Sequence, residues 1–205
     1  VKEACGHPDI VGLAVSTRPD CIHESYLEVL REAQGKYGTN ITVELGLQSV
    51  NSHTLLKIGR CHTVAEFIDA ALQIGRYHFD LCAHIIADLP WDDRIDLEEA
   101  AKLVSVLPVT EIKIHSLYII KGTKLAKIYE KGDIKLLPTE EYAERVVLIL
   151  SMLRPDIVVQ RIVGRASANT LSVNGGRPWW EVKEYIEKLM RNRHLQQGSA
   201  CNYLY

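Results

Sequence analysis

The chain has 205 residues, of which 47% are hydrophobic and 24% charged, and these values fit one globular domain that can bury a core without staples. No apolar run reaches the roughly 18 residues that cross a bilayer, and the first five residues lack the layout of a signal peptide. We therefore expect a cytoplasmic protein with no membrane partner. The net charge of −2 is unevenly spread: residues 1–110 hold nine Lys and Arg against sixteen Asp and Glu, and residues 111–205 hold fifteen against ten.

Apolar segments alternate with helical patterns along the whole chain. The segments predict buried strands at residues 10–16, 42–47, 81–87, 111–120 and 157–163. Helical periodicity predicts helices at 22–34, 63–75, 93–106 and 139–153, a short helix after 121–123, and a last helix from Pro178 onward. Gly35 and Gly75 are expected to end the first two. Thr63 and Glu66 form a capping box at the start of the second of these helices. The stretch 164–176 is predicted to be a polar loop.

The alternation of strands and helices predicts an α/β fold with a parallel sheet and right-handed crossovers. We expect a single domain over residues 1–205, in which residues 165–205 form a loop and a C-terminal helical extension. A closed barrel needs eight strand–helix units and five are present. The sequence therefore predicts an open sheet or a part of a barrel.

Polar residues gather at or beyond the predicted strand ends, where parallel α/β folds bind ligands. The residues in question are Ser16 to Asp20, Gln48 to Asn51, His84, Asp88 to Asp92, His115, Tyr118, Gln160 and Arg161. Taken singly, each is better explained by a helix cap or a hydrogen-bonded core residue, but their clustering at one end of the sheet favours a site. The five cysteines, at 5, 21, 61, 82 and 201, show no ligand spacing and fit reduced thiols, so we expect no metal ligands within the chain.

Four linked segments resemble the uncharacterised-type radical S-adenosylmethionine (SAM) family, the YhcC/YtqA-like group. They are VGLAVSTRPDC at 11–21, ELGLQS at 44–49 with IGRCH at 58–62, HIIADLP at 84–90, and IKIHSLY at 112–118 with KGT at 121–123. Their order and spacing match the family from about residue 9 to 163. The TRPD turn is also shared with the elongator-type catalytic subunit, which modifies wobble uridine in tRNA.

The resemblance implies a parallel partial (β/α) barrel whose first two β/α units, with the loop of three cluster cysteines, precede Val1. It implies SAM and a [4Fe–4S] cluster as cofactors, a 5′-deoxyadenosyl radical as the reactive product, and cluster ligands outside this chain. By motif position, Gln48 and His84 face the SAM ribose, and Arg60 meets the methionyl carboxylate, which suits its planar fork. Ser16 is expected at the barrel mouth, and His115 and Tyr118 near adenine or substrate.

Three departures from the family pattern stand out. GLPGE becomes Asp88-Leu89-Pro90-Trp91-Asp92, RGH becomes Arg60-Cys61-His62, and RITGD becomes Arg161-Ile162-Val163-Gly164-Arg165. The first removes two glycines from a turn that would approach adenine. The third reverses the charge at the end of the last strand.

The substrate that the resemblance suggests is tRNA, modified at a wobble-uridine side chain. The basic C-terminal half agrees, with Lys121, Lys124, Lys127, Lys131, Lys135, Arg191 and Arg193, and phosphate contacts would make binding salt-dependent. A merely solubilising face explains these residues equally well. Two other classes stay open: a metal-dependent barrel hydrolase with His84 and His115 as ligands, and a degenerate, non-catalytic scaffold. We also expect the strand at 10–16 to form a sheet edge that favours dimerisation or aggregation.

Overall fold

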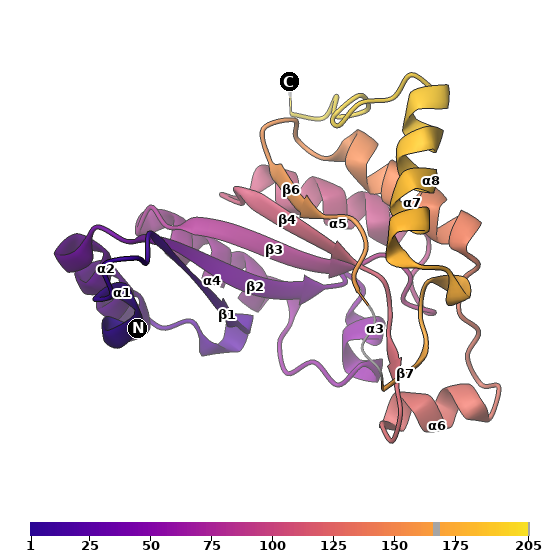
Figure 1. Cartoon of the computed structure of the whole chain (residues 1–205), viewed down its shortest axis with the longest axis horizontal. Helices are drawn as coiled ribbons and strands as arrows, with labels where there is room; N and C mark the ends of the chain where they lie inside the picture. Colours follow the sequence, from indigo (N-terminus) through magenta and orange to yellow (C-terminus); the bar gives the residue numbers. More distant parts are fainter. Residues whose placement is uncertain (166–168, 205) are drawn as a thin grey trace.

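The computed structural model describes residues 1–165 and 169–204, and its centre is a five-stranded parallel sheet (Figure 1). The strands stand in the order β1-β2-β3-β4-β6, so neighbours in the sheet follow one another along the chain. Their bounds are β1 Gly12–Thr17, β2 Asn40–Gln48, β3 Asp80–Ile86, β4 Glu111–His115 and β6 Val158–Arg161. The predicted parallel α/β fold is confirmed.

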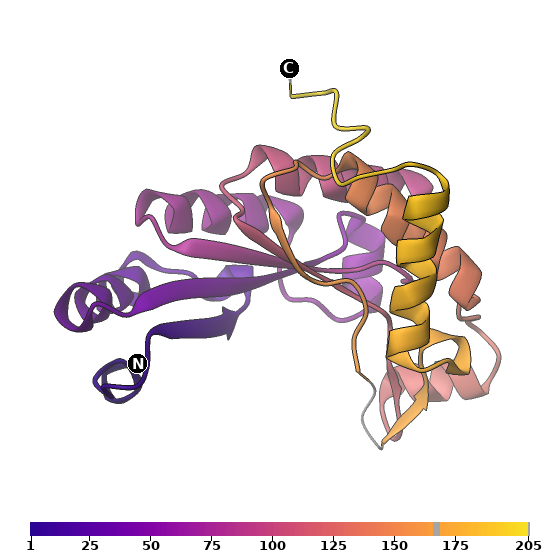
Figure 2. The same cartoon turned by 45° about the horizontal axis from the view of Figure 1, so that its top comes forward.

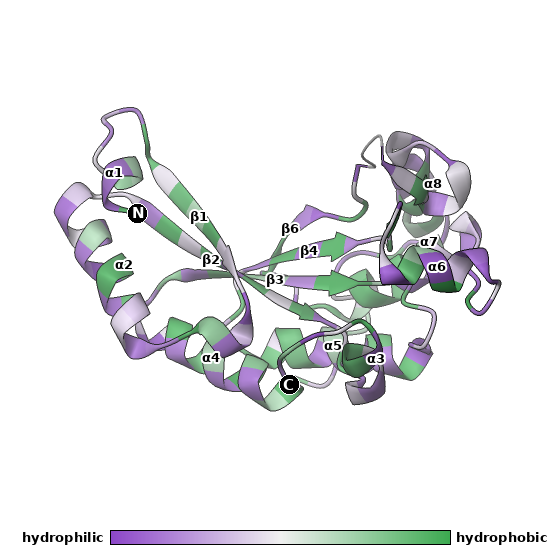
Figure 3. Ribbon diagram, turned by 90° about the horizontal axis from the view of Figure 1, so that it is seen from below, coloured by the Kyte–Doolittle hydropathy of each residue, from purple (hydrophilic) through white to green (hydrophobic). Residues whose placement is uncertain are grey.

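The connections between the strands are helical. The longer helices are α2 Glu24–Tyr37, α4 Val64–Arg76, α5 Arg94–Val106, α7 Thr139–Met152 and α8 Trp179–Asn192, and the shorter ones are α1 Lys2–Cys5, α3 Ser52–Lys57 and α6 Lys124–Glu130. Two 3-10 turns, Pro19–Cys21 and Asn174–Gly176, complete the helical elements. In Figure 3, α2, α4 and α5 lie along the same side of the strands.

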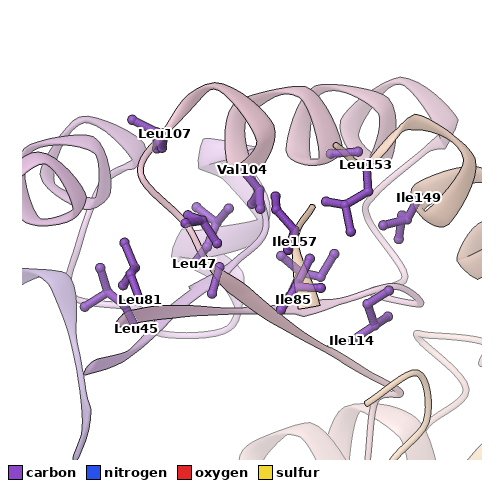
Figure 4. Packing of buried hydrophobic residues seen from close by; sticks show 14 of the residues in the cluster. Leu45, Leu47, Leu81, Ile85, Val104, Leu107, Ile114, Ile149, Leu153 and Ile157 are labelled. Atoms are coloured by element: carbon purple, nitrogen blue, oxygen red, sulfur yellow. The ribbon is translucent and has the colours of Figure 1, made fainter. Parts of the chain in front are cut away.

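Alternation along the strands gives the sheet two different faces. On β2 the residues at odd positions, such as Val43 and Leu45, are fully buried, whereas Glu44 between them is only partly buried. The buried side chains point toward the helices and pack with residues such as Val104 and Leu153 (Figure 4). The opposite face keeps the polar residues, and it is this face that carries part of the candidate site.

A second, smaller structure lies beyond the carboxyl ends of the strands. The predicted strand at 111–120 divides in two, because β4 ends at His115 and β5 Ile119–Ile120 leaves the main sheet. β5 pairs antiparallel with β7 Thr170–Ser172, so the predicted loop at 164–176 contains a strand, while its residues 166–168 lie outside the described residues. A cluster of Leu89, Leu117, Ile119, Ala126 and Ile134 forms the core of this part.

The first strand differs from its prediction. Residues 10–16 were expected to be buried on both faces, but β1 alternates between exposed and half-buried residues, and Val11 before it is 82% exposed. The reason is position: β1 is an outer strand with β2 as its one neighbour in the sheet. The expectation of a sheet edge here is therefore correct.

Two glycines that were expected to end helices lie inside them instead. Helix α2 continues past Gly35 to Tyr37 and ends at Gly38, which has the left-handed φ of 67°. Helix α4 continues past Gly75 to Arg76. A Cβ on Gly75 would lie 2.7 Å from Cγ of Pro108, so glycine there permits close approach of α4 to the loop before β4. The capping box of Thr63 and Glu66 is present as predicted.

Within residues 1–165 and 169–204, no helix is both long and apolar enough to traverse a bilayer.

Candidate functional site at the carboxyl ends of the strands

A carboxylate in the middle of β2 organises the polar face of the sheet. Glu44 accepts a hydrogen bond from Nζ of Lys113 on β4 at 2.5 Å and another from Oγ of Ser16 on β1 at 2.9 Å. His84, on the strand between them, has Nε2 3.1 Å from Oε2 of Glu44. The side chains of Glu44 and Lys113 are 11% and 16% exposed, so most of their charge is shielded from water. Four neighbouring strands thus contribute to one network.

The environment sets the protonation states in this network. Burial opposes ionisation of Glu44, but the hydrogen bonds from Lys113 and Ser16 outweigh it and lower the pKa of the carboxyl. Burial also lowers the pKa of His84, against the opposing effect of Glu44. At neutral pH, therefore, Glu44 is ionised and His84 is neutral.

His84 has a second histidine beside it. The ring centroids of His84 and His115 are 5.1 Å apart. Burial, with a smaller effect of His84, lowers the pKa of His115 to about 4. Nε2 of His115 is buried and has no hydrogen-bond partner among the described residues. A buried, neutral imidazole with a free nitrogen can donate to or accept from a ligand.

A cavity of about 540 Å³ lies at the ends of β2 and β3. Four polar side chains line it, those of Gln48, Lys57, Arg60 and Lys124. The apolar lining includes Ile86, Leu89 and Leu117, and α6 closes one side. Nη2 of Arg60 donates to the carbonyl oxygen of Gly46 at 3.2 Å, and Nε donates to Nε2 of His62 at 3.1 Å. Nη1 of Arg60 makes no hydrogen bond within the described part of the chain, so the guanidinium keeps donors for a ligand.

Glycine at position 46 allows this arrangement. A Cβ there would lie 2.6 Å from Nε2 of Gln48 and 2.9 Å from Nη2 of Arg60. Gln48 itself has a φ of 69°, in the left-handed region, at an irregularity of the pairing with β3. The end of β2 therefore bends so that the Gln48 and Arg60 side chains meet over a bare backbone.

The turn after β3 holds two buried carboxyls. Asp88 Oδ1 accepts a hydrogen bond from the backbone N–H of Leu117 at 2.6 Å, which joins the end of β3 to the segment between β4 and β5. Burial raises the pKa of Asp88 to about 7. Burial also raises the pKa of Asp92, which is 5% exposed. The acid at position 88, a departure from the family pattern, thus has a structural role.

The six predicted site residues fall into three places. Gln48 and Arg60 share the cavity, and Ser16, His84 and His115 belong to the sheet face around Glu44. Tyr118 lies apart from both: a Cβ on Gly164 would lie 1.6 Å from its hydroxyl oxygen, so its ring packs directly on the backbone after β6. Among the residues that the structure describes, Ser16, His84, His115 and Tyr118 do not line the 540 Å³ cavity.

Sequence reasoning missed Glu44 and Lys113, which hold the network together. Both residues belong to the motifs ELGLQS and IKIHSLY, but neither was predicted to have a role in the site. The available signal was periodicity: Glu111, Lys113 and His115 alternate with buried isoleucines, and Glu44 alternates with Val43 and Leu45. A charge at such a position within an apolar strand predicts a charged partner on the adjacent strand.

Comparison with known proteins relates the chain to radical SAM proteins. The profile of the radical SAM C-terminal domain matches residues 109–192. The uncharacterized protein YtqA of Bacillus subtilis is 36% identical over 194 residues, covering 93% of this chain and 59% of YtqA. Protein YhcC of Escherichia coli is 30% identical over 204 residues, covering 97% of this chain and 64% of YhcC. The chain thus contains a radical SAM C-terminal domain and is similar to YtqA and YhcC over nearly its whole length.

More distant relatives agree with the fold of this radical SAM chain. A tRNA uridine(34) acetyltransferase of Methanocaldococcus infernus is 25% identical over 190 residues, covering 91% of this chain and 34% of that protein. The structure of archaeal Methanocaldococcus infernus Elp3 with an N-terminal deletion superimposes with a TM-score of 0.74 at 22% identity, covering 91% of this chain and 43% of that one. The radical SAM chain spans about three fifths of the length of YtqA and YhcC.

Of the two cofactors that the radical SAM family implies, the described residues suit SAM but not the [4Fe–4S] cluster. The 540 Å³ cavity combines the donors of Gln48 and Arg60 with apolar side chains such as Ile86, Leu89 and Leu117. This is the chemistry of a site for SAM, which carries a carboxylate, hydroxyls and an adenine ring. The described residues contain no group of three His, Cys, Asp or Glu that could hold a metal ion. They therefore do not provide a site for a [4Fe–4S] cluster, and a hydrolase metal site at His84 and His115 also lacks a third ligand.

Proposed function

We propose that this chain forms the SAM-facing wall of a radical SAM enzyme. The observation that carries the proposal is the cavity in which Gln48 and Arg60 converge at the carboxyl ends of β2 and β3. Bound to a [4Fe–4S] cluster held by residues outside this chain, SAM supplies a 5′-deoxyadenosyl radical in this family.

In this proposal the residues of the chain bind and orient. Arg60, anchored by Gly46 and His62, offers its free donors to the methionyl carboxylate of SAM. Gln48 hydrogen-bonds the ribose hydroxyls. Ile86, Leu89 and Leu117 exclude water from the cavity and contact the adenine ring.

His84 and His115 have a different part in the proposal. They lie on the sheet face around Glu44, outside the cavity lining, and both have a lowered pKa. We assign them to the space where substrate meets the ribose end of SAM. Nε2 of His115, buried and without a partner in the described residues, is the group available for that contact. Ser16 and Lys113 hold Glu44 by hydrogen bonds, and Nε2 of His84 lies 3.1 Å from Oε2 of Glu44.

The SAM part is tested by equilibrium binding to the 205-residue chain, which needs no turnover. Arg60→Ala removes the carboxylate contact, so the SAM dissociation constant should rise about tenfold or more. Arg94→Ala, which removes an exposed arginine of α5, is the matched control and should leave SAM affinity unchanged. Equal affinity of the Arg60 variant and the parent chain would remove Arg60 from the site.

The substrate that we propose is tRNA, with a wobble-uridine side chain as the modified group. Support comes from the relative named tRNA uridine(34) acetyltransferase and from the charge of the C-terminal half. Lys121, Lys124, Lys127, Lys131 and Lys135, on and around α6, are all exposed, and Lys124 also lines the cavity. Arg193, in contrast, makes two hydrogen bonds to Glu144, so it offers less charge.

A salt titration of tRNA binding tests this choice. Replacing Lys124, Lys127 and Lys131 together by alanine should weaken binding and reduce the slope of affinity against salt by about two to three. Replacing Lys2, Lys36 and Lys102, which are exposed on other elements, makes the matched control. Binding that does not depend on salt, or equal loss in both triple variants, would contradict a tRNA site at α6.

A further inference from the structure

A second cavity, of about 650 Å³, lies away from the site described above. It extends between the outer strand β6 and one face of α8. Trp179, Lys183, Glu187 and Met190 repeat at helical spacing along that face, and Gln160 and Arg161 come from the strand. In Figure 2, α8 stands beside the end of the sheet that β6 forms.

The rim of this cavity carries three cations and one anion. Arg161, Arg165 and Lys183 line it with Glu187 as the acid, and Lys183 pairs with Glu187 at 3.2 Å. Neither Arg161 nor Arg165 has a carboxylate partner among the described residues. Most other arginines do have one, such as Arg177 with Glu140 and Arg193 with Glu144. Two guanidinium groups therefore remain available at one cavity.

The position of Arg165 is defined by an aromatic ring. Its guanidinium carbon lies 4.5 Å from the ring centroid of Trp179, which is the distance of a cation–π contact. The contact holds the planar donor at the cavity wall and leaves its N–H groups free. Arg165 also stands where the RITGD pattern has an aspartate, so the charge at this position is reversed in this chain.

The floor of the cavity is apolar. Leu150 of α7, Val159 of β6 and Met190 of α8 line it with Ile162 and Val163, and Gln197 is engaged with the backbone oxygens of Arg154 and Ile157. An inorganic anion alone would leave this floor unused. A volume of about 650 Å³ is within the range of small-molecule sites.

We infer that this cavity binds an organic phosphate, with the phosphate on Arg161 and Arg165 and the organic body on the apolar floor. Guanidinium groups match phosphate oxygens in a bidentate manner, which suits the two arginines. The site is separate from the cavity of Gln48 and Arg60, so the inference does not depend on SAM binding.

The test is calorimetric titration of the 205-residue chain at low salt with three probes. Uridine 5′-monophosphate carries both parts of the proposed ligand, orthophosphate carries the anion alone, and uridine carries the body alone. We expect saturable binding of the monophosphate, with a dissociation constant below about 1 mM, and weaker binding of the other two. Uridine binding as tightly as the monophosphate would overturn the phosphate site, and orthophosphate binding as tightly would overturn the organic body.

Variants locate the binding. Arg165→Ala and Arg161→Ala should each weaken the monophosphate about tenfold, and R165D more. Both side chains are exposed, so the fold should survive these changes. Two control variants should leave the affinity for the monophosphate unchanged. Arg94→Ala removes an exposed arginine of α5, and Arg60→Ala removes the arginine of the 540 Å³ cavity. Absence of monophosphate binding, or equal loss in all four variants, would overturn the proposal.

Discussion

Glu44 and Lys113 are charged residues in the middle of a sheet, and their partnership explains why they are tolerated there. Each side chain is largely shielded from water, with Glu44 11% and Lys113 16% exposed. Removing one partner leaves the other charge shielded and unpaired, which costs more than the pair itself contributes.

A double-mutant cycle tests this coupling. Glu44→Gln and Lys113→Met should each lower the free energy of unfolding by roughly 2–4 kcal/mol. The double variant should lose clearly less than the sum, because neither charge is then left alone. Urea unfolding of the four proteins measures the effect. Additive losses would mean that the two side chains act independently.

Asp88 gives the molecule a pH dependence of known sign. Its pKa is about 7 in the folded chain and near 4 when unfolded. Between these values the folded state holds the proton more tightly, so the free energy of unfolding falls as pH rises through this window.

Asp88→Asn should reduce the decrease in the free energy of unfolding between about pH 4 and 7 by an amount on the order of a few kcal/mol. The amide oxygen of the asparagine can still accept the hydrogen bond from the backbone N–H of Leu117. Denaturant unfolding at several pH values measures it. Asp133→Asn, at an exposed position, is the control. An unchanged pH profile in the Asp88 variant would mean that the carboxyl is ionised throughout.

At the scale of elements, two helical glycines that look alike in the sequence have opposite environments. Nothing lies within 4 Å of a Cβ on Gly35, whereas a Cβ on Gly75 would lie 2.7 Å from Pro108. Gly35→Ala should therefore stabilise the chain by roughly 0.5–1 kcal/mol through helix propensity. Gly75→Ala should destabilise it, because α4 must move away from Pro108. Thermal unfolding of both variants provides the comparison, and equal shifts would contradict it.

The elements themselves were largely predictable, and their exceptions have physical causes. Hydrophobic periodicity and caps located all five parallel strands and the main helices, including the capping box at Thr63. The division of 111–120 at His115 was not predictable, because β5 leaves the sheet to pair with β7, a partner about fifty residues later in the sequence. Burial of β1 was overpredicted because an apolar run does not reveal whether a strand has one neighbour or two.

The candidate site was predictable only in part, for a related reason. The motif positions correctly predicted Gln48 and Arg60 as site residues, and these two share a cavity. The motifs did not indicate that His84 and His115 lie elsewhere, on the polar face of the sheet. The bend at Gln48 and the bare backbone at Gly46 separate them, and both depend on local backbone geometry. For the cavity beside α8, the sequence offered Gln160 and Arg161 at a strand end and the unexpected arginine at position 165, but nothing that placed α8 against them.

At the scale of the whole molecule, β1 and β6 are the two outer strands of one open sheet. α8 flanks β6, whereas β1 pairs with β2 alone among the described strands and keeps Gly12, Ala14 and Ser16 exposed. Unpaired backbone groups at such an edge favour pairing with another strand.

We predict concentration-dependent dimerisation of the 205-residue chain through the β1 edge. Light scattering coupled to size-exclusion chromatography measures it. Val11→Lys, which places a charge at an 82% exposed position beside the strand, should shift the chain toward monomer. Leu56→Lys, at a 75% exposed position on α3, is the control. A parent chain that remains monomeric at all concentrations would contradict the prediction.

Binding of SAM in the cavity at the ends of β2 and β3 is tested directly by a titration followed by NMR amide shifts. SAM should shift the amides of Gly46, Gly59 and Leu117, which border the cavity, and should leave Gly35 and the β6–α8 cavity unchanged. Shifts confined to residues such as Trp179 and Lys183, or no shifts at millimolar SAM, would contradict the account.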